Sequence, residues 1–355
     1  MSAQKVTAVF DIGKTNKKFF LFDSEFQEVY REYSRFENIT DEDGHPTEDV
    51  YALEKWIKES FDRLLRSEKY DIQAINFSTY GASLVHLDEN GNLVTPLYNY
   101  TKEIPDEVVA SFYETYGPEL ELAAETGSPK AGLLNSGIQL YWLKHYKPEV
   151  FTKIKKTLHL PQFISYLFTA IPLSEYTSIG CHTALWNYTK KDYHDWVYKE
   201  GFNTILPPIV STETSININY RGKRLKIGVG IHDSSAALLP YVRSLRKRFV
   251  LVSTGTWSIS LNPFSEGALT TDEISQNCLN YMRINGNPVK AARLFLGDEY
   301  SFQVREIEAK FGLDESFHRN VKFDRDIYLR LAGKPKRYFK WRSLDSDKMP
   351  EATHL

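Results

Sequence analysis

A short polar stretch between two apolar runs carries groups that can hold a phosphate. From Val9 to Asp23 an apolar run enters a turn of Asp, Gly, Lys, Thr and Asn, and a Phe-rich run leaves it, which predicts a β-hairpin with a polar tip. Gly13 lets the backbone approach a ligand closely, and successive amides of such a turn can point at an anion. The side chains expected to add hydrogen bonds and positive charge at this tip are Lys14, Thr15, Asn16, Lys17 and Lys18.

Asp11 ends the first strand of this hairpin and cannot bind a phosphate directly. Its carboxylate is instead a candidate for the magnesium ion that accompanies nucleotide phosphates, bound through water. A Walker P-loop is rejected, because that motif requires Gly where the chain has Ala8, and a helix after Thr15, where the chain has a strand. An ordinary hairpin tip without a ligand is the alternative that this stretch leaves open.

A second segment far downstream repeats this design. Between Phe249 and Leu261, an apolar strand is followed by a tip of Ser, Thr and Gly and then by a strand that alternates apolar and polar residues. Two hairpins of this kind predict two related domains that face one nucleotide. The expected phosphate contacts of the second tip are Thr254, Gly255 and Thr256.

Asp233 stands where a predicted strand ends and a helix begins, shortly before the second hairpin. Transfer of a phosphoryl group to a hydroxyl requires mainly in-line positioning and charge stabilisation, together with a carboxylate that accepts the hydroxyl proton. Asp233 is our candidate for this carboxylate, Gly230 gives clearance, and His232 is assigned a supporting role. The alternative is that Asp233 is a plain helix N-cap, a position that Asp fills well.

A small-residue turn after another predicted strand is a candidate sugar site. The strand Ile72–Phe77 leads into Ser78–Asp88, where small residues leave room for a ligand while hydroxyls and one aromatic ring can contact a sugar. A tight turn that only closes a hairpin is the alternative. The candidate contacts are Thr79, Tyr80, Gly81 and Ala82.

The elements around these sites predict an α/β domain with a mixed central sheet. Glu25–Phe36 has the composition of a strand, and Val50–Leu65 has apolar residues at helical spacing along one face. Glu103–Leu185 is mostly helical, and within it Glu175 either orients a substrate or caps a turn. The residues of this part that we expect in the core rather than against a ligand are Trp142 and Leu143.

The composition is that of an ordinary soluble protein. With 355 residues, 42% hydrophobic content and 25% charged residues, the chain can bury a sizeable core in about two domains. A net charge of -2 gives no overall attraction to nucleic acid or membrane, and we expect neither as a partner. The two cysteines lack metal-ligand spacing and form no disulfide framework, which fits a cytoplasmic location. No apolar run approaches the roughly 18 residues that a membrane span needs.

The two hairpins and the Asp233 segment together resemble the FGGY carbohydrate kinases, within the actin-like ATPase superfamily. The first hairpin matches the family pattern Asp-x-Gly-x-Thr-x-x-Lys/Arg without gaps, from Asp11 to Lys18. The amino-acid sequence around Asp233 and in the second hairpin is most similar to that of rhamnulokinase-like members. The resemblance implies an α/β fold of two ribonuclease-H-like domains with mixed central sheets around a cleft. It implies that residues 1–245 form an N-terminal domain that binds sugar and phosphate. It also implies that residues 246–355 are the start of a C-terminal domain that binds phosphate and nucleotide.

The same resemblance implies the chemistry. The matching Asp of the relatives is the general base, so Asp233 is expected to take the proton of a sugar hydroxyl while ATP, with Mg²⁺ near Asp11, donates its γ-phosphoryl group. The turn at Thr79–Ala82 and His232 are expected to lie against the sugar, a ketose similar to rhamnulose, fuculose or xylulose. A homodimer is left open.

The sequence departs from the family pattern at two places. Many relatives carry Arg and Asp after the aromatic residue of the segment that ends at Tyr100, where this chain has Thr101 and Lys102. No Gly-Gly pair occurs in the chain, although complete members use one to seat adenine, and residues 333–355 are polar and interrupted by proline. We therefore expect a fragment of a longer protein rather than a reduced second domain.

Three functions from different classes remain. The leading one is an ATP-dependent sugar kinase. The second is a sugar- or nucleotide-binding protein that kept the fold without turnover, favoured by the departures at Thr101 and Lys102. The third is another actin-like ATPase with a protein partner, against which Asp233 argues, because a hydrolase needs no base for a sugar hydroxyl.

Overall fold

The computed structural model describes residues 3–254, 258–334 and 342. The chain divides into two compact units, the first formed by Met1–Leu251 with Leu261–Ala292 and the second by Val252–Ser260 with Arg293–Leu355. The expectations for Gly255 and Thr256, and for most of residues 333–355, lie outside the described residues.

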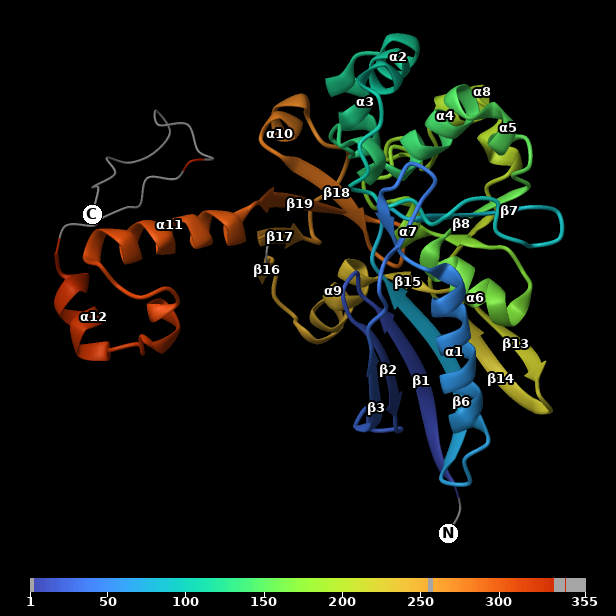
Figure 1. Ribbon diagram of the computed structural model, residues 1–355, viewed down its shortest axis with the longest axis horizontal. Coiled ribbons are helices and arrows are strands. Elements are labelled where there is room, and N and C mark those ends of the chain that lie inside the picture. The colour runs from blue at the N-terminus through green and yellow to red at the C-terminus, as the bar shows by residue number, and fades with distance from the viewer. Residues whose placement is uncertain (1–2, 255–257, 335–341, 343–355) are drawn as a thin grey trace. The chain divides into compact units, whose positions relative to one another are not determined.

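A mixed seven-stranded sheet forms the centre of the first unit (Figure 1). Its order is β13-β14-β6-β1-β2-β3, with β15 pairing the end of β6. The pairs β1–β2, β2–β3 and β13–β14 are antiparallel, whereas β6 runs parallel to β1, β14 and β15. The strands are β1 (Gln4–Ile12), β2 (Lys17–Phe22), β3 (Glu28–Ser34), β6 (Tyr70–Thr79), β13 (Ser215–Tyr220), β14 (Lys223–Gly228) and β15 (Ile231–His232). The first hairpin, the strand after it and the strand around residues 72–77 are therefore confirmed.

Periodicity in the sequence decides which face of each element is buried. In β1, Val6, Ala8, Phe10 and Ile12 alternate with more exposed residues, as a strand with one buried face requires. Helix α1 has the predicted bounds, Val50–Leu65, and its buried face repeats at helical spacing. The side chain of Asp49 accepts a hydrogen bond from the backbone N–H of Ala52 and so caps this helix.

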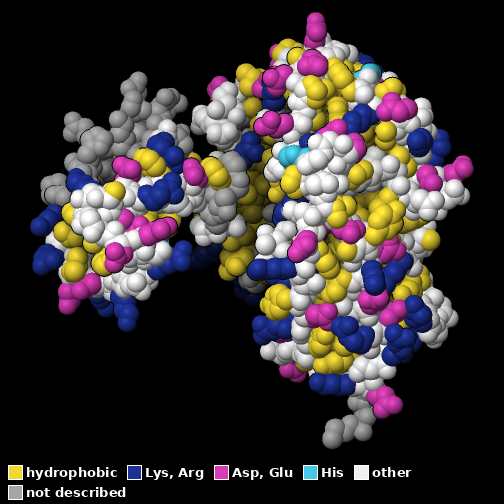
Figure 2. Space-filling view, viewed as in Figure 1, with side chains coloured by type: hydrophobic (Ala, Val, Ile, Leu, Met, Phe, Trp, Pro, Cys, Tyr) yellow, Lys and Arg dark blue, Asp and Glu magenta, His cyan; other side chains and the backbone are white. Residues whose placement is uncertain are grey.

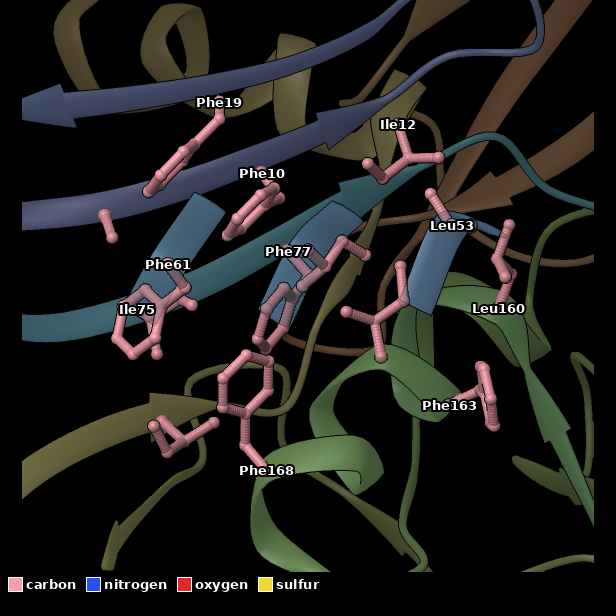
Figure 3. Packing of buried hydrophobic residues seen from close by; sticks show 14 of the residues in the cluster. Phe10, Ile12, Phe19, Leu53, Phe61, Ile75, Phe77, Leu160, Phe163 and Phe168 are labelled. Atoms are coloured by element: carbon pink, nitrogen blue, oxygen red, sulfur yellow. The ribbon is translucent and has the colours of Figure 1, made fainter. Parts of the chain in front are cut away.

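Aromatic rings from the sheet and its covering helices fill the main core (Figure 3). Phe10 and Phe19 stack across the first hairpin with ring centroids 4.0 Å apart. Phe168 of helix α6 (Leu160–Thr169) packs against Phe61 of α1 and Phe77 of β6. This core holds the first hairpin and the end of β6 in fixed register, which is what positions the site.

A second, mostly helical core follows β6 in the chain. Trp142 and Leu143 are buried in it, which confirms that they serve packing. Its longer elements are β7 (Leu84–Leu87), α2 (Asp106–Tyr116), α3 (Glu119–Thr126), α4 (Ser136–Tyr146), α5 (Pro148–Phe151), β8 (Lys156–His159), α7 (Tyr176–Ile179) and α8 (Asp195–Lys199). The shorter pieces are β9 (Ser174–Glu175), β10 (Trp186–Asn187), β11 (Asp192–Tyr193), β12 (Ile209–Val210), and 3-10 turns η1 (Gly132–Leu134) and η2 (Phe202–Thr204). Two short strands, β4 (Ile39–Thr40) and β5 (Pro46–Thr47), pair with one another before α1.

The last part of the chain contributes to both units. After helix α9 (Asp233–Ser244), the first unit contains helix α10 (Thr271–Ser275) and the hairpin of β18 (Cys278–Met282) and β19 (Pro288–Leu294). The remaining elements are β16 (Leu251–Thr254), β17 (Ser258–Asn262), α11 (Leu296–Phe311), η3 (Phe317–Asn320) and α12 (Arg325–Ala332). The helix expected over residues 291–312 is confirmed from Leu296 to Phe311, whereas its first residues belong to β19, whose β-branched and small residues pair with β18.

Charges of both signs are interspersed on the visible face of the first unit (Figure 2). Among the described residues, none of the helices combines the length and apolar composition that crossing a membrane requires.

Candidate functional site

The tip of the first hairpin is a tight turn. The backbone N–H of Gly13 donates to the carbonyl of Asn16 at 2.9 Å, and a Cβ on Gly13 would lie 3.0 Å from that oxygen. Lys18 Nζ lies 2.9 Å from Asp11 Oδ2, and each side chain is about one-third exposed, 35% and 32%. The Asn16 side chain accepts a hydrogen bond from Arg35 Nε at 2.7 Å. The tip thus presents two partly exposed charged groups and a backbone turn to solvent.

Lys17 has a different role from the one expected. Its side chain is buried, and its ammonium donates to the carbonyl oxygens of Gly13 and Lys14, each at 3.1 Å. The ammonium also forms an ion pair with the buried carboxylate of Glu48. The expectation that Lys17 faces a phosphate is therefore wrong, because its place in β2 on the same face as Phe19 turns it inward.

The candidate sugar turn follows β6 directly and lies beside β15. Thr79 pairs with His232 across these two strands, and the hydroxyl of Thr79 donates to the carbonyl of Tyr80. A Cβ on Gly81 would lie 2.8 Å from His232 Nε2, so only glycine fits there without displacing the imidazole. Ala82 is buried with a φ of 57°, a left-handed conformation that turns the chain sharply. The segment is therefore a packed turn against β15, and β7 pairs with β8 rather than with β6.

Lys14 reaches from the hairpin tip to this turn. Its ammonium lies 5.0 Å from the centroid of the Tyr80 ring and 5.1 Å from that of Tyr100, a geometry typical of cation–π contacts. Burial lowers the pKa of Lys14 below its usual value, although the nearby carboxylate of Glu48 opposes this shift. The structure thus brings a cation of the first hairpin against the ring of Tyr80 in the candidate sugar turn and against the ring of Tyr100.

Asp233 is the first residue of α9, and His232 occupies the N-cap position without a capping hydrogen bond from its side chain. The alternative that Asp233 is a plain N-cap is therefore wrong. Its side chain is 38% exposed, and its Oδ1 accepts a hydrogen bond from Ser234 Oγ at 3.1 Å. Burial and, to a smaller extent, the Asp233 carboxylate raise the pKa of Tyr100. Tyr100 therefore lies against the ammonium of Lys14 and close enough to Asp233 to respond to its charge.

His232 is buried beside Asp233. Its Nε2 lies 3.4 Å from Asp233 Oδ1, and its ring stacks on Tyr281 at 5.6 Å between centroids. Burial lowers the pKa of His232, which favours the neutral imidazole. The backbone N–H of His232 donates to Thr177 Oγ1 at 3.0 Å, which fixes the turn into α9.

Glu175 stabilises the turn into α9 through a network of hydrogen bonds. It is fully buried and caps α7, accepting hydrogen bonds from the backbone N–H groups of Thr177 and Ser178. The hydroxyls of Thr177 and Thr212 donate to the same carboxylate. Of the two roles expected for Glu175, the cap is confirmed. Thr177, which donates to Glu175, also accepts a hydrogen bond from the backbone of His232 and so links the two residues.

Three residues of the site were missed by the sequence analysis: Glu48, Tyr100 and Thr177. No motif marks Glu48 or Thr177, since each acts through a partner far away in the chain. Lys17 could have been placed correctly, because in the alternation of β2 it lies on the same face as the buried residues Phe19 and Leu21. Lys102, one of the departures from the family pattern, is buried and pairs with Asp41 and Asp43 at 2.6 Å each.

The first unit thus brings together the expected groups of the hairpin tip, the turn at Thr79–Ala82, His232 and Asp233. Thr254 is an exposed residue of β16 in the second unit. Within the described parts of the chain, no three His, Cys, Asp or Glu side chains converge as a ready-made metal site.

Comparison with known proteins agrees with this geometry. The N-terminal domain of the FGGY family of carbohydrate kinases matches residues 6–234. A rhamnulokinase of Halalkalibacterium halodurans is 27% identical over 261 residues, which are 70% of this chain and 52% of that protein. A rhamnulokinase of Bacteroides thetaiotaomicron is 25% identical over 265 residues, 72% of this chain and 54% of that protein. The chain therefore spans about half the length of these relatives.

Solved structures show the same fold. The crystal structure of a carbohydrate kinase from Novosphingobium aromaticivorans superposes with a TM-score of 0.76 at 27% identity, over 89% of this chain and 67% of that one. The likeness and the mixed central sheet confirm the expected α/β class.

Proposed function

Because this chain belongs to the FGGY family of carbohydrate kinases, we propose that it transfers the γ-phosphoryl group of ATP to a hydroxyl of a ketose similar to rhamnulose, fuculose or xylulose. One observation carries this proposal most directly. The ammonium of Lys14 lies over the ring of Tyr100, and the pKa of Tyr100 responds to the carboxylate charge of Asp233. A phosphate held at the hairpin and a sugar held at the turn would therefore meet beside a carboxylate.

In the proposed reaction, Asp233 accepts the proton of the acceptor hydroxyl as the hydroxyl oxygen bonds to the γ-phosphorus. The bond from this phosphorus to the oxygen that bridges it to the β-phosphate breaks, and ADP leaves with the electron pair. Asp233 is suited to this task because its carboxylate is partly exposed and is not used as a helix cap. A base within hydrogen-bond reach of the hydroxyl is the requirement that this role sets.

The hairpin tip is proposed to bind the ATP phosphates through the backbone at Gly13 and through Lys14, Thr15, Asn16 and Lys18. Thr254, Gly255 and Thr256 are proposed to bind them from the second hairpin. The partly exposed Asp11 carboxylate fits a magnesium ion held through water, since carboxylate oxygen is a preferred ligand of Mg²⁺. When bound, this ion would supply positive charge to the phosphate oxygens.

The acceptor is proposed to lie against Thr79, Tyr80, Gly81, Ala82 and His232. The neutral imidazole of His232 stacks on Tyr281, and Thr177 fixes its backbone, so that the ring would hold one face of the sugar. Residues 1–245 would then bind sugar and phosphate, and residues 246–355 would form the start of the nucleotide-binding domain. We also propose a cytoplasmic location, which the two free cysteines fit.

Coupled ADP release with MgATP, across a panel of ketoses and polyols, tests this function. One sugar is expected to raise the rate about tenfold or more, and Asp233→Ala is expected to abolish the stimulation. A protein that binds sugar or nucleotide without any stimulated release would instead be the binding protein without turnover. The departures at Thr101 and Lys102 favour that second function, although Lys102 is engaged with Asp41 and Asp43 in the core.

A further inference from the structure

A buried ammonium holds the backbone of the phosphate hairpin. Lys17 Nζ has three partners: the carbonyl oxygens of Gly13 and Lys14 and the carboxylate of Glu48. Two of its N–H groups donate to these carbonyl oxygens, and opposite charge holds the third partner, the Glu48 carboxylate. Both side chains of the ion pair are 4% exposed. In such surroundings an ion pair persists only with good geometry and with its remaining hydrogen bonds made.

This arrangement sets the direction of the amides at the tip. The C=O and N–H of a trans peptide point in opposite directions, and no described peptide bond is cis. Holding the carbonyls of Gly13 and Lys14 toward Lys17 therefore turns the N–H groups of Lys14 and Thr15 away from it. Both amides lie in the turn that the proposed function assigns to phosphate binding.

The same carboxylate also holds the sugar turn. The hydroxyl of Tyr80 donates a hydrogen bond to Glu48. Burial and the Glu48 charge raise the pKa of Tyr80 well above its usual value, so the phenol keeps its proton. Glu48 comes from the short segment after β5 and belongs to neither the hairpin nor the turn, yet it contacts both.

We propose that Glu48 is a positioning residue that couples the sugar turn to the phosphate-binding amides of the hairpin. This inference rests on the proposed function, because it assumes that the hairpin binds phosphate. Groups of one buried hydrogen-bond network strengthen one another, so a loss at one end is transmitted to the other. The Tyr80 hydroxyl should therefore affect phosphate binding although it faces Glu48 and not the hairpin tip.

The test measures the dissociation constant of magnesium tripolyphosphate by calorimetry, a probe that needs no adenine. Tyr80→Phe keeps the ring beside Lys14 and removes only the hydroxyl. It is expected to weaken binding roughly threefold to tenfold, and Glu48→Gln is expected to weaken it by more. The double variant should bind no more weakly than Glu48→Gln alone, because the hydroxyl acts only through the carboxylate.

Tyr116→Phe is the matched control. It removes another hydrogen bond from a tyrosine to a carboxylate, the one to Glu200, far along the chain in the helical core. This variant is expected to bind the probe like the unaltered protein, while its melting temperature shows what such a bond contributes to stability alone.

The outcomes distinguish a failure of this inference from a failure of the proposed function on which it rests. An unaltered protein that binds neither tripolyphosphate nor MgATP overturns both. If the unaltered protein binds and Tyr80→Phe binds equally well, or if the two substitutions add, the coupling is overturned while the phosphate site stands. The mild Tyr80→Phe change keeps the test decisive if Glu48→Gln fails to fold.

Discussion

The ammonium of Lys14 lies over the ring of Tyr80, 5.0 Å from its centroid, so that a cation of the first hairpin contacts the candidate sugar turn. The ring of Tyr100 lies at a similar distance on the same ammonium, and Tyr100 is also close enough to Asp233 to respond to its charge. The family pattern leaves the position of Lys14 unspecified. The motif therefore does not predict this contact, which sets the first prediction.

Replacing Lys14 with Met should lower kcat about a hundredfold, because a cation beside the transferred group stabilises charge that develops in the transition state. Binding of MgADP, which lacks the γ-phosphate, should change little. Steady-state kinetics with the stimulating sugar and calorimetry with MgADP measure the two effects. Equal losses of MgADP affinity and kcat would show that Lys14 serves only general phosphate binding.

The same lysine predicts a pH dependence. Burial lowers the pKa of Lys14 below 10.5, so its ammonium loses a proton at a lower pH than an ordinary lysine. The activity that depends on this charge is full below the lowered pKa and falls as pH rises through it. Lys14→Arg keeps its charge at these pH values, so any activity that it retains should decline only at higher pH. The profile of kcat against pH on the alkaline side distinguishes the two proteins, and identical profiles would exclude Lys14 as the titrating group.

Asp233→Asn should reduce sugar-stimulated ADP release by a factor of about a hundred or more, since a carboxamide cannot accept the hydroxyl proton. Nucleotide binding and the melting temperature should stay near those of the unaltered protein, because the carboxylate is partly exposed and caps no helix. Rapid-mixing measurements of a single turnover give the chemical step directly. A variant with normal turnover would remove Asp233 from the reaction.

Asp11→Asn should raise the magnesium concentration needed for half-maximal rate about tenfold, as expected for a group that holds a metal ion through water. It also removes the carboxylate that pairs with Lys18 at 2.9 Å. A magnesium titration of the kinase rate measures the effect. Asp195→Asn, which removes the carboxylate of the exposed pair with Lys190, is the control and should leave the titration unchanged.

Gly81→Ala should disrupt the sugar site without unfolding the protein. Its new Cβ would lie 2.8 Å from His232 Nε2 and 2.9 Å from Cδ2, so the imidazole must move. We expect the KM for the sugar to rise about tenfold or more, because a misplaced contact group costs orientation at the reacting atoms. Gly333→Ala, with no atom within 4 Å of the added Cβ, is the matched control. Unchanged sugar kinetics in Gly81→Ala would mean that His232 does not contact the sugar.

Glu175→Gln should lower the free energy of unfolding by about 2–3 kcal/mol, because an amide nitrogen would face N–H and O–H donors that now meet a buried carboxylate. Urea unfolding followed by circular dichroism measures this loss. The control is Glu213→Gln, whose exposed pair with Arg243 should contribute within about 0.5 kcal/mol. A loss as small as that of the control would mean that the cap of α7 carries no more stability than a surface pair.

Much of the fold could be predicted because it depends on local pattern. Alternation of apolar residues specified the hairpin of β1 and β2, and helical spacing specified α1 with its bounds. The sequence pattern also placed Asp233 correctly at the junction between a strand and a helix. It failed at residues 291–294, which belong to β19, where pairing of Ala291 and Ala292 with β18 outweighed the helical pattern that follows.

The roles of the three lysines at the hairpin tip show what the sequence determined and what the tertiary structure decided. The sequence by itself determined that a basic turn joins two strands, because turn residues and strand periodicity act over a few neighbours. Only the tertiary structure decided that Lys14 faces Tyr80 and Tyr100 and that Lys17 pairs with Glu48. The pair of Lys18 with Asp11 is local, because the two residues are opposite one another in the register of the hairpin. The Glu48 and Tyr80 partners are separated from the tip by 31 and more residues, and packing of the whole core brings them back to it. The presence of a charged residue near a turn is set by the local sequence. Its interaction partner depends on which distant residues the fold brings next to it.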